Sequence, residues 1–311
     1  MQRNWQSNGI VSVIRRLFIM ALLCADPAFG AQQVTDDDGR VLELPGPARR
    51  IVSLSPGATA MLFAAGAGDR VVATPRYSDE PAAASRIPRI GDAQSFDIER
   101  ILALQPDVVV AWTGGTPALA LQRLERLRVR VYRHHVTRLD DLPASLQRLG
   151  RLAGTSSQAD AAAASLAVRI QALRARHAAA ARRSLLIQVW DRPIYTVGRE
   201  QLLSDVIEAC GYRNVFDDLS APGPAVSVEA VVVRDPDVIL ALAPDAAMAR
   251  SWLDGWRAFP SLRAVRDTRL LADTDPRLSR LGPETVAAAE SLCQRLAGAL
   301  ESVTGVTVPA Q

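Results

Sequence analysis

The side chains that could carry out chemistry are few and of restricted types. All 36 basic residues are arginines, so a phosphate-binding loop with its lysine and a Schiff-base lysine are both excluded. The sequence contains neither a Gly-x-Ser-x-Gly nucleophile motif nor a His-Glu-x-x-His zinc motif. We therefore expect a non-enzymatic protein with no resident metal or cofactor.

Two adjacent histidines, His134 and His135, are the main candidates for another kind of chemistry. Neighbouring side chains near a strand end point to opposite faces, so the two residues form a poor paired metal site. Three roles stay open for them. They could be solvated loop histidines, one could be an axial ligand to a haem or cobalt centre, or one could serve a secreted hydrolase or metalloenzyme together with a cleft carboxylate.

Aromatic residues gather where predicted strands end. They make up only 5% of the chain, yet several tryptophans and tyrosines fall directly after strands. Flat aromatic faces suit a large planar or amphipathic ligand. Trp112 and Trp190 could instead be ordinary core or hinge residues. With the polar residues at the same positions, the candidate ligand-binding residues are Ser55, Tyr77, Trp112, Trp190, Tyr195, Asp275 and Arg280.

The elements that must position these residues alternate between strands and helices. Short apolar or β-branched runs predict strands at 51–54, 71–74, 108–112 and 129–132, and again at 185–190, 238–242 and 270–272. This alternation predicts an α/β fold of two Rossmann-like lobes with mostly parallel sheets. The Ala-rich stretch 156–183 lacks Gly and Pro and predicts one long α-helix that joins the lobes, with Thr155 and Ser156 as candidate caps. A ligand cleft is then expected between the lobes, at the carboxyl ends of the strands.

The amino terminus predicts export. Arg15 and Arg16, the apolar run 17–25 and small residues before Ala31 have the order of a cleavable signal peptide. Lipid anchoring at Cys24 and twin-arginine export are lesser alternatives. The expected organisation is a signal peptide at 1–30, an N-terminal α/β lobe at 31–155, the linking helix at 156–183 and a C-terminal α/β lobe at 184–311.

Charge and cysteine content limit the binding partners and the cellular compartment that we expect for this protein. The net charge of +3 falls to +1 without residues 1–30, which hold three Arg and one Asp, so nucleic acid is not an expected partner. No later stretch is apolar enough for a membrane span. Without Cys24 only Cys210 and Cys293 remain, and such a pair in an oxidising compartment favours one disulfide over two unpaired buried thiols.

A short segment repeats in the two halves. Asp-Ile-Glu-Arg-Ile at 97–101 and Gln-Pro-Asp-Val-Val at 105–109 match Ser-Val-Glu-Ala-Val at 227–231 and Asp-Pro-Asp-Val-Ile at 235–239. Each copy predicts a helix that ends at a Pro-Asp turn and leads into a buried parallel strand. Glu99 and Glu229 fall at equivalent helix starts, where a carboxylate complements the helix dipole. Their symmetry also suits a two-fold symmetric partner that carries arginines.

Several motifs together resemble the periplasmic cobalamin-binding proteins of vitamin B12 ABC importers. In the first half these are Arg50-Ile51-Val52-Ser53-Leu54-Ser55-Pro56, Tyr77-Ser78-Asp79, Ile98-Glu99-Arg100-Ile101 with Gln105-Pro106-Asp107, and Ala111-Trp112-Thr113-Gly114-Gly115. In the second half they are Glu208-Ala209-Cys210-Gly211, Asn214-Val215-Phe216, Val226-Ser227-Val228-Glu229 and Ser291-Leu292-Cys293. The resemblance covers most of the chain after residue 30. It implies two α/β lobes bridged by one long helix, with slight hinge motion.

The resemblance also implies a function. We expect a monomeric periplasmic protein that captures cobalamin or a related corrinoid and delivers it to an inner-membrane ABC permease. Tyr77, Trp112 and Tyr195 fall where the family's aromatics contact the corrin. Glu99 and Glu229 fall where its glutamates dock on permease arginines.

The aromatic cradle of the family is only partly present. Two further cleft tryptophans of the family align with Ala93 and Gly223, so the missing surface is absent or is supplied by another residue such as Trp190. Relatives with the same framework carry haem or ferric siderophores. These cargoes are therefore the alternatives to a corrinoid.

Overall fold

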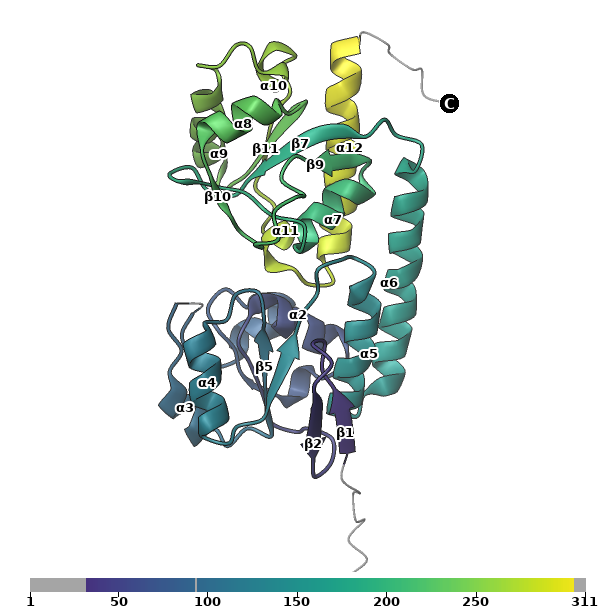
Figure 1. Ribbon diagram of the computed structural model, residues 1–311. Coiled ribbons are helices and arrows are strands. Elements are labelled where there is room, and N and C mark those ends of the chain that lie inside the picture. Colours follow the sequence, from purple (N-terminus) through teal and green to yellow (C-terminus); the bar gives the residue numbers. More distant parts are fainter. Residues whose placement is uncertain (1–31, 93, 305–311) are drawn as a thin grey trace, which may run out of the picture.

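The computed structural model describes residues 32–92 and 94–304, and within them the predicted two-lobed α/β fold is confirmed. One long helix, α6, runs along the side of both lobes (Figure 1). The predicted signal peptide and Cys24 lie outside the described residues. No helix in the described part of the chain has the length and apolar character needed to cross a membrane.

The N-terminal lobe contains a parallel sheet of order β4-β3-β5-β6 and a separate antiparallel hairpin, β1-β2. It runs from the hairpin to α5, and α6 follows. Its elements are β1 (Gln32–Thr35), β2 (Val41–Leu44), β3 (Ile51–Ser53), α2 (Pro56–Ala64), the 3₁₀ helix η1 (Gly68–Arg70), β4 (Val71–Ala73), the 3₁₀ helix η2 (Ala82–Arg86), α3 (Ile98–Ala103), β5 (Val108–Trp112), α4 (Ala118–Arg126), β6 (Val131–His134), α5 (Asp141–Ala153) and α6 (Ser156–His177).

The C-terminal lobe contains a second parallel sheet, of order β12-β11-β7-β9, and the short antiparallel pair β8-β10. Its elements are β7 (Arg183–Gln188), β8 (Ile194–Tyr195), α7 (Leu202–Ala209), β9 (Tyr212–Asn214), β10 (Ala225–Val226), α8 (Val228–Arg234), β11 (Val238–Leu242), α9 (Ala246–Trp256), α10 (Arg263–Arg266), β12 (Leu270–Asp273), α11 (Pro276–Arg280) and α12 (Thr285–Thr304).

Each parallel sheet is buried on both faces. Along β5 the residues Val108 and Val110 belong to one apolar cluster, whereas Val109 belongs to another on the opposite face, as the two-residue period of a strand requires. The same alternation occurs along β11. One of these clusters is continuous through both lobes and includes the inner side of α6, so the two lobes share part of their core.

Helix α6 holds the lobes together. Its buried stripe includes Leu166, Ile170 and Leu173, and it packs against α5 of the N-terminal lobe and against α7 and α12 of the C-terminal lobe. Arg174 on α6 forms ion pairs with Asp140 at 2.7 Å and with the buried Asp205 of α7 at 2.6 Å. One side chain of α6 therefore contacts both lobes.

The linking helix ends at His177 rather than at residue 183. The residues that follow turn into β7, where Arg183 already pairs with Tyr212 of β9, so strand pairing competes with continuation of the helix. Thr155 precedes the helix without capping it, because its hydroxyl donates to the carbonyl oxygen of Ala65 at 2.6 Å.

The repeated segment forms the same structure twice. Asp97 and Ser227 cap α3 and α8. After each helix Asp107 or Asp237 leads into the central strand and accepts a backbone N–H from the neighbouring strand segment, at 2.8 Å from Arg50 and from Ser184 respectively. The predicted structural repeat is thus present.

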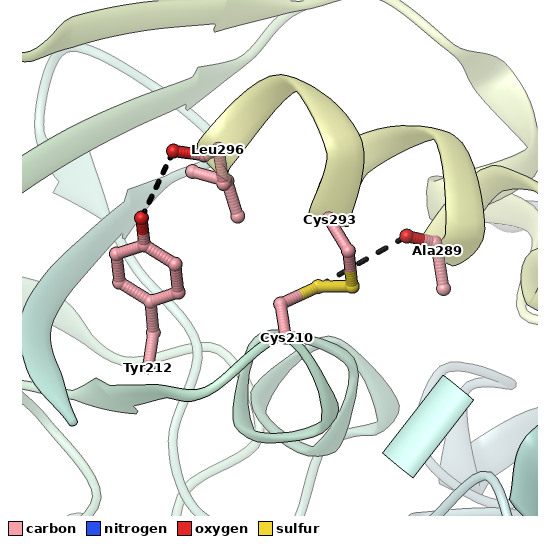
Figure 2. Close-up of a disulfide and its surroundings, with 5 residues drawn as sticks. All are labelled: Cys210, Tyr212, Ala289, Cys293 and Leu296. Atoms are coloured by element: carbon pink, nitrogen blue, oxygen red, sulfur yellow. Dashed lines mark hydrogen bonds between the residues drawn. A yellow bond between two sulfur atoms is a disulfide. The ribbon is translucent and has the colours of Figure 1, made fainter. Parts of the chain in front are cut away.

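The predicted disulfide joins two helices of the C-terminal lobe. Cys210 caps the end of α7 and is bonded to Cys293 of α12, with 4.9 Å between their Cα atoms (Figure 2). Next to it the Tyr212 hydroxyl donates to the carbonyl oxygen of Leu296 at 3.1 Å. The alternative of two unpaired thiols is excluded for this structure.

Candidate ligand-binding site

A cavity of about 560 Å³ lies between the lobes, a volume within the usual range of small-molecule sites. Both sheets turn the carboxyl ends of their strands toward it. The N-terminal lobe contributes Ser55, Pro56, Gly57, Ala58, Tyr77, Trp112, His134 and Val136. The C-terminal lobe contributes Val189, Trp190, Leu242, Ala243, Pro244, Asp273, Thr274, Asp275, Pro276, Ser279, Arg280 and Leu281. The predicted inter-lobe cleft is therefore present, and six of the seven candidate ligand-binding residues line it.

Trp112 ends β5 and lines the cavity above two glycines. A Cβ atom on Gly115 would lie 2.0 Å from the Trp112 ring, and one on Gly114 would lie 2.9 Å from its Nε1. Both distances are too short for a side chain. The Trp-Thr-Gly-Gly motif therefore lets the indole lie flat on backbone.

Tyr77 lies in the loop after β4 and adopts a left-handed backbone conformation, with φ of 65°. Such a conformation is uncommon for a residue other than glycine and is found disproportionately at functional sites. The loop is anchored beside it, since Ser78 is buried and Arg89 contacts Asp79 at 3.2 Å. The Tyr77 side chain is 69% exposed and is available to a ligand.

Trp190 follows β7 and faces the cavity from the C-terminal lobe. It is 51% exposed, and its ring packs against Trp252 with 6.2 Å between centroids. Tyr195 bonds to the Trp190 carbonyl oxygen through its backbone N–H at 3.2 Å. However, Tyr195 does not belong to the residues that line the cavity. The chain turns back between the two residues, so the tyrosine follows the β8-β10 ribbon instead.

The predicted polar contacts are already engaged within the protein. The Ser55 hydroxyl caps α2 by accepting the backbone N–H of Ala58 at 3.1 Å. Asp275 caps α11, and the Arg277 guanidinium contacts both of its carboxylate oxygens, at 2.9 Å for Oδ1 and 2.6 Å for Oδ2. These hydrogen bonds with Arg277 lower the pKa of Asp275.

Arg280 connects the two lobes at the cavity. Its guanidinium lies 3.7 Å from Asp79 and 3.9 Å from Glu80, which belong to the loop that carries Tyr77. The backbone of the same residue packs on α2, because a Cβ atom on Gly57 would lie 2.1 Å from the Arg280 carbonyl oxygen. The lobes are thus in direct contact at this edge of the cavity.

His134 is a buried residue of the cavity wall and not a solvated loop histidine. It ends β6, is 2% exposed, and its Nδ1 lies 2.9 Å from Oδ2 of Asp37 in the β1-β2 turn. Its neighbour His135 is partly exposed and contacts Asp38 at 2.8 Å. The two imidazoles therefore have separate partners.

Asp37 is the centre of a buried polar network. Its carboxylate also accepts hydrogen bonds from Ser145 at 2.7 Å and Tyr132 at 2.8 Å, and it contacts Arg148 at 3.1 Å. Burial raises the pKa of Asp37, but hydrogen bonds from His134 and Ser145 outweigh it and lower the pKa to about 2. The carboxylate is therefore ionised at neutral pH. Burial next to this charge raises the pKa of Tyr132.

Glu99 and Glu229 lie outside the cavity, in the first turns of α3 and α8. Both helices lie on the side of the molecule opposite α6 (Figure 1). The Glu99 side chain is 88% exposed and contacts Arg123 at 3.6 Å. Hydrogen bonds from its own backbone N–H and from Ser227 lower the pKa of Glu229. Both carboxylates face solvent, one from each lobe.

The Asp37 network was not predicted from the sequence. Asp37 lies 97 residues before His134, and nothing local announces that the two side chains meet. The signal that was available is the Asp-Asp-Asp-Gly turn between two short alternating runs, which is typical of a β-hairpin. Within the described residues, no group of three or more His, Cys, Asp or Glu side chains is arranged to hold a metal ion.

Two α/β lobes that are joined by one long helix and enclose a cavity at their strand ends define a solute-binding protein. The chain belongs to the periplasmic binding protein family, whose family model matches residues 51–276.

Within this family the chain is similar to proteins described as vitamin B12-binding and heme-binding. It is 34% identical over 256 residues to the vitamin B12-binding protein of Vibrio cholerae, covering 82% of this chain and 92% of the relative. The crystal structure of a periplasmic vitamin B12-binding protein of Vibrio cholerae superimposes with a TM-score of 0.74, covering 82% of this chain and 99% of that one. A periplasmic heme-binding protein from Roseiflexus sp. RS-1 is 25% identical, with a TM-score of 0.68, and covers 81% of this chain and 99% of that one.

Proposed function

We propose that this protein is a periplasmic receptor that captures cobalamin or a related corrinoid and delivers it to an inner-membrane ABC permease. The observation that carries the proposal is the inter-lobe cavity, to which Trp112 contributes an indole from one lobe and Trp190 an indole from the other. The vitamin B12-binding relative at 34% identity supports a corrinoid as the cargo. The protein acts by binding and not by turnover.

The cavity residues have complementary roles in this proposal. Trp112 and Trp190 offer flat apolar faces to the two sides of the macrocycle. Tyr77 is exposed in the loop after β4 and can contact the bound ring from the edge of the cavity. Arg280 links the cavity to the loop that carries Tyr77, so it can report occupancy from one lobe to the other.

The delivery step uses Glu99 and Glu229, the two exposed glutamates on α3 and α8, whose surface we call the rim. An exposed carboxylate on each lobe, at equivalent positions of a structural repeat, suits a permease whose two halves each offer an arginine. We assign Glu99 and Glu229 to this contact. Their distance from the cavity separates docking from cargo binding.

Parallel ligand titrations test the cargo. The protein without residues 1–30 is titrated with cyanocobalamin, haemin and a ferric hydroxamate, with binding followed by calorimetry and by ligand absorbance. Saturable one-to-one binding of cyanocobalamin, weakened by Trp112→Ala, is the expected result. Saturable binding of haemin alone would replace the corrinoid by haem as cargo, and product formation from any ligand would contradict the receptor role.

A further inference from the structure

We propose that His134 sets the specificity of the cavity by accepting a hydrogen bond from an amide N–H on the rim of the cargo. This inference rests on the proposed function and deepens it. A corrin ring carries amide side chains around its edge, whereas the haem ring carries carboxylates. The proposed contact therefore favours an amide-rimmed macrocycle over a carboxylate-rimmed one.

The hydrogen-bond partners of Asp37 determine which nitrogen of His134 faces the cavity. The Asp37 carboxylate can only accept hydrogen bonds, so the imidazole Nδ1 at 2.9 Å must carry the proton. In the neutral ring, Nε2 then presents a lone pair. Nε2 has no hydrogen-bond partner among the described residues, although the residue lines the cavity. A ligand group is the partner that would satisfy it.

The orientation of this lone pair is fixed by packing. Ser145 on α5 and Arg148 one turn later both contact Asp37, and Tyr132 of β6 donates to it from the sheet. A side chain held by a carboxylate with this many partners cannot turn away from the cavity without breaking a buried network. In many functional sites a carboxylate on the far side of a histidine ring orients it in the same way.

The place of His134 in the fold directs it to the rim of a planar ligand. Strand β6 is the edge strand of its sheet, next to β5 with Trp112, and the chain continues from β6 into α5, which packs on α6. His134 thus belongs to the wall of the cavity on the side of the linking helix. A flat macrocycle held between the two lobes turns its edge toward that wall.

An acceptor that the bound ligand covers discriminates between an amide and a carboxylate. An amide N–H satisfies Nε2, whereas a carboxylate at the same place brings two acceptors together and leaves both unsatisfied. We expect the amide form to bind about tenfold more tightly than the carboxylate form at the position that meets His134.

The test compares cyanocobalamin with its three monocarboxylic acid derivatives, in each of which one ring amide is replaced by a carboxylate. Titrations at pH 8 give the affinity ratio of the amide form to each acid. The wild-type protein should show a ratio of about ten for at least one acid. His134→Ala should bring that ratio close to one, and His134→Gln should restore part of it because its amide oxygen is again an acceptor.

Two further variants separate this role from a structural one. His135→Ala removes the neighbouring imidazole, which contacts Asp38 and does not line the cavity, and should keep the wild-type ratio. Asp37→Asn can donate to Nδ1, which moves the proton of the imidazole to Nε2 and should shift the preference toward the acids. A loss of packing alone would weaken all ligands equally and leave the ratio unchanged.

Each failure has a distinct meaning. Equal ratios in wild type and His134→Ala, with cyanocobalamin still bound, would overturn the role of His134 and leave the proposed function intact. A shift in the visible spectrum of bound aquacobalamin that disappears in His134→Ala would show cobalt coordination and overturn the hydrogen-bond assignment. No binding of any corrinoid by the wild-type protein would overturn the proposed function together with this inference.

Discussion

The two lobes share a repeated framework but build opposite walls of one cavity in different ways. On the N-terminal side the polar residues that line the cavity include His134, whose Nδ1 contacts the buried Asp37 carboxylate. On the C-terminal side the cavity is faced by Asp273 and Asp275, whose charges are neutralised by Arg295 and Arg277 of the same lobe. The repeat therefore determines the framework of both lobes and the positions of the two exposed glutamates. The polar residues that line the cavity differ between the lobes.

The lobes also differ in what stabilises them. The C-terminal lobe has the Cys210–Cys293 disulfide between α7 and α12. The N-terminal lobe has no disulfide among its described residues, and the Asp37 network instead ties its first hairpin to β6 and α5. The C-terminal lobe is thus stabilised by a covalent bond and the N-terminal lobe by a buried charge. We therefore expect the two lobes to respond differently to loss of the disulfide and to acid.

Removal of the disulfide should have the largest effect on stability, and that effect should fall on the C-terminal lobe. The bond closes a loop with a sequence separation of 83, for which the chain-entropy model gives about 4 to 5 kcal/mol of stabilisation. We expect the Cys210→Ala, Cys293→Ala variant to lose about that much free energy of unfolding. Hydrogen exchange should accelerate most in α7, β9 and α12. Equal acceleration in both lobes would contradict a lobe-specific role.

Acid should act on the N-terminal lobe. Asp37 has a pKa of about 2 in the folded protein against an ordinary value of 3.8, so its stabilisation is complete above about pH 4 and is lost as the pH falls through 2. The linkage amounts to about 2 kcal/mol. Urea unfolding at pH 5 and pH 2.5 should therefore show a larger loss for wild type than for Asp37→Asn.

Asp275 provides the matched control in the other lobe. Its hydrogen bonds with Arg277 lower its pKa as well, but the pair is only partly buried, so solvent screens it more than it screens Asp37. Asp275→Asn should change the pH dependence less than Asp37→Asn does. A larger effect from Asp275 would mean that the partly buried pair, and not the Asp37 network, dominates acid sensitivity.

The fold could be predicted because its signals are local. The strands at 108–112 and 238–242 were predicted with their observed bounds, since each follows a Pro-Asp turn in a repeated segment. Strand β6 was predicted two residues early. Arg128 adopts a left-handed φ of 60° and Val129 still bonds to Leu124 of α4, so the pairing starts only at Val131.

In the C-terminal lobe the predicted bounds of β7 were also wrong by two residues. The predicted strand at 185–190 was too late because it ignored partners distant in sequence. Ser184 already pairs with β9 and bonds to Asp237, while Val189 leaves the sheet to bond with the Tyr195 carbonyl oxygen. Partners of this kind lie far along the chain and leave no local pattern.

The site could be predicted to the level of strand ends but not of side-chain directions. Trp112 and Trp190 were identified because they follow strands whose ends meet between the lobes. Tyr195 was placed in the same group, yet the β8-β10 ribbon takes it away from the cavity. His134 was left open between several roles, because its burial depends on a hairpin at the other end of the lobe.

The two cavity tryptophans offer a test of the walls themselves. Trp112→Ala and Trp190→Ala should each weaken cyanocobalamin binding about tenfold through lost stacking area. Only Trp112→Ala should also lower the melting temperature, because that ring packs on Gly114 and Gly115 whereas Trp190 is half-exposed. Calorimetry and thermal unfolding measure the two effects. Tyr195→Ala should change neither, and weaker binding by that variant would return Tyr195 to the site.

We expect the smallest difference between the lobes in the contribution of Glu99 and Glu229 to permease binding, since the repeat makes their positions nearly symmetric. Glu99 must give up its contact with Arg123 when it docks, whereas Glu229 has no ion-pair partner among the described residues. We therefore expect Glu229→Ala to weaken binding to the permease about tenfold and Glu99→Ala only about threefold. Binding to the reconstituted permease and stimulation of its ATP hydrolysis measure both.

Removal of Arg123 should make the rim symmetric. In the Arg123→Ala background Glu99 no longer has a competing partner, so Glu99→Ala should then cost as much docking affinity as Glu229→Ala. Arg100 adjoins Glu99 but has Ala230 as its counterpart in the repeat, and Arg100→Ala should leave docking unchanged. Cyanocobalamin affinity should stay at the wild-type level in all of these variants. Loss of cargo binding in the glutamate variants would place both carboxylates in the cavity. If Glu229→Ala still weakened docking more than Glu99→Ala in the Arg123→Ala background, the permease, and not this protein, would make the two contacts unequal.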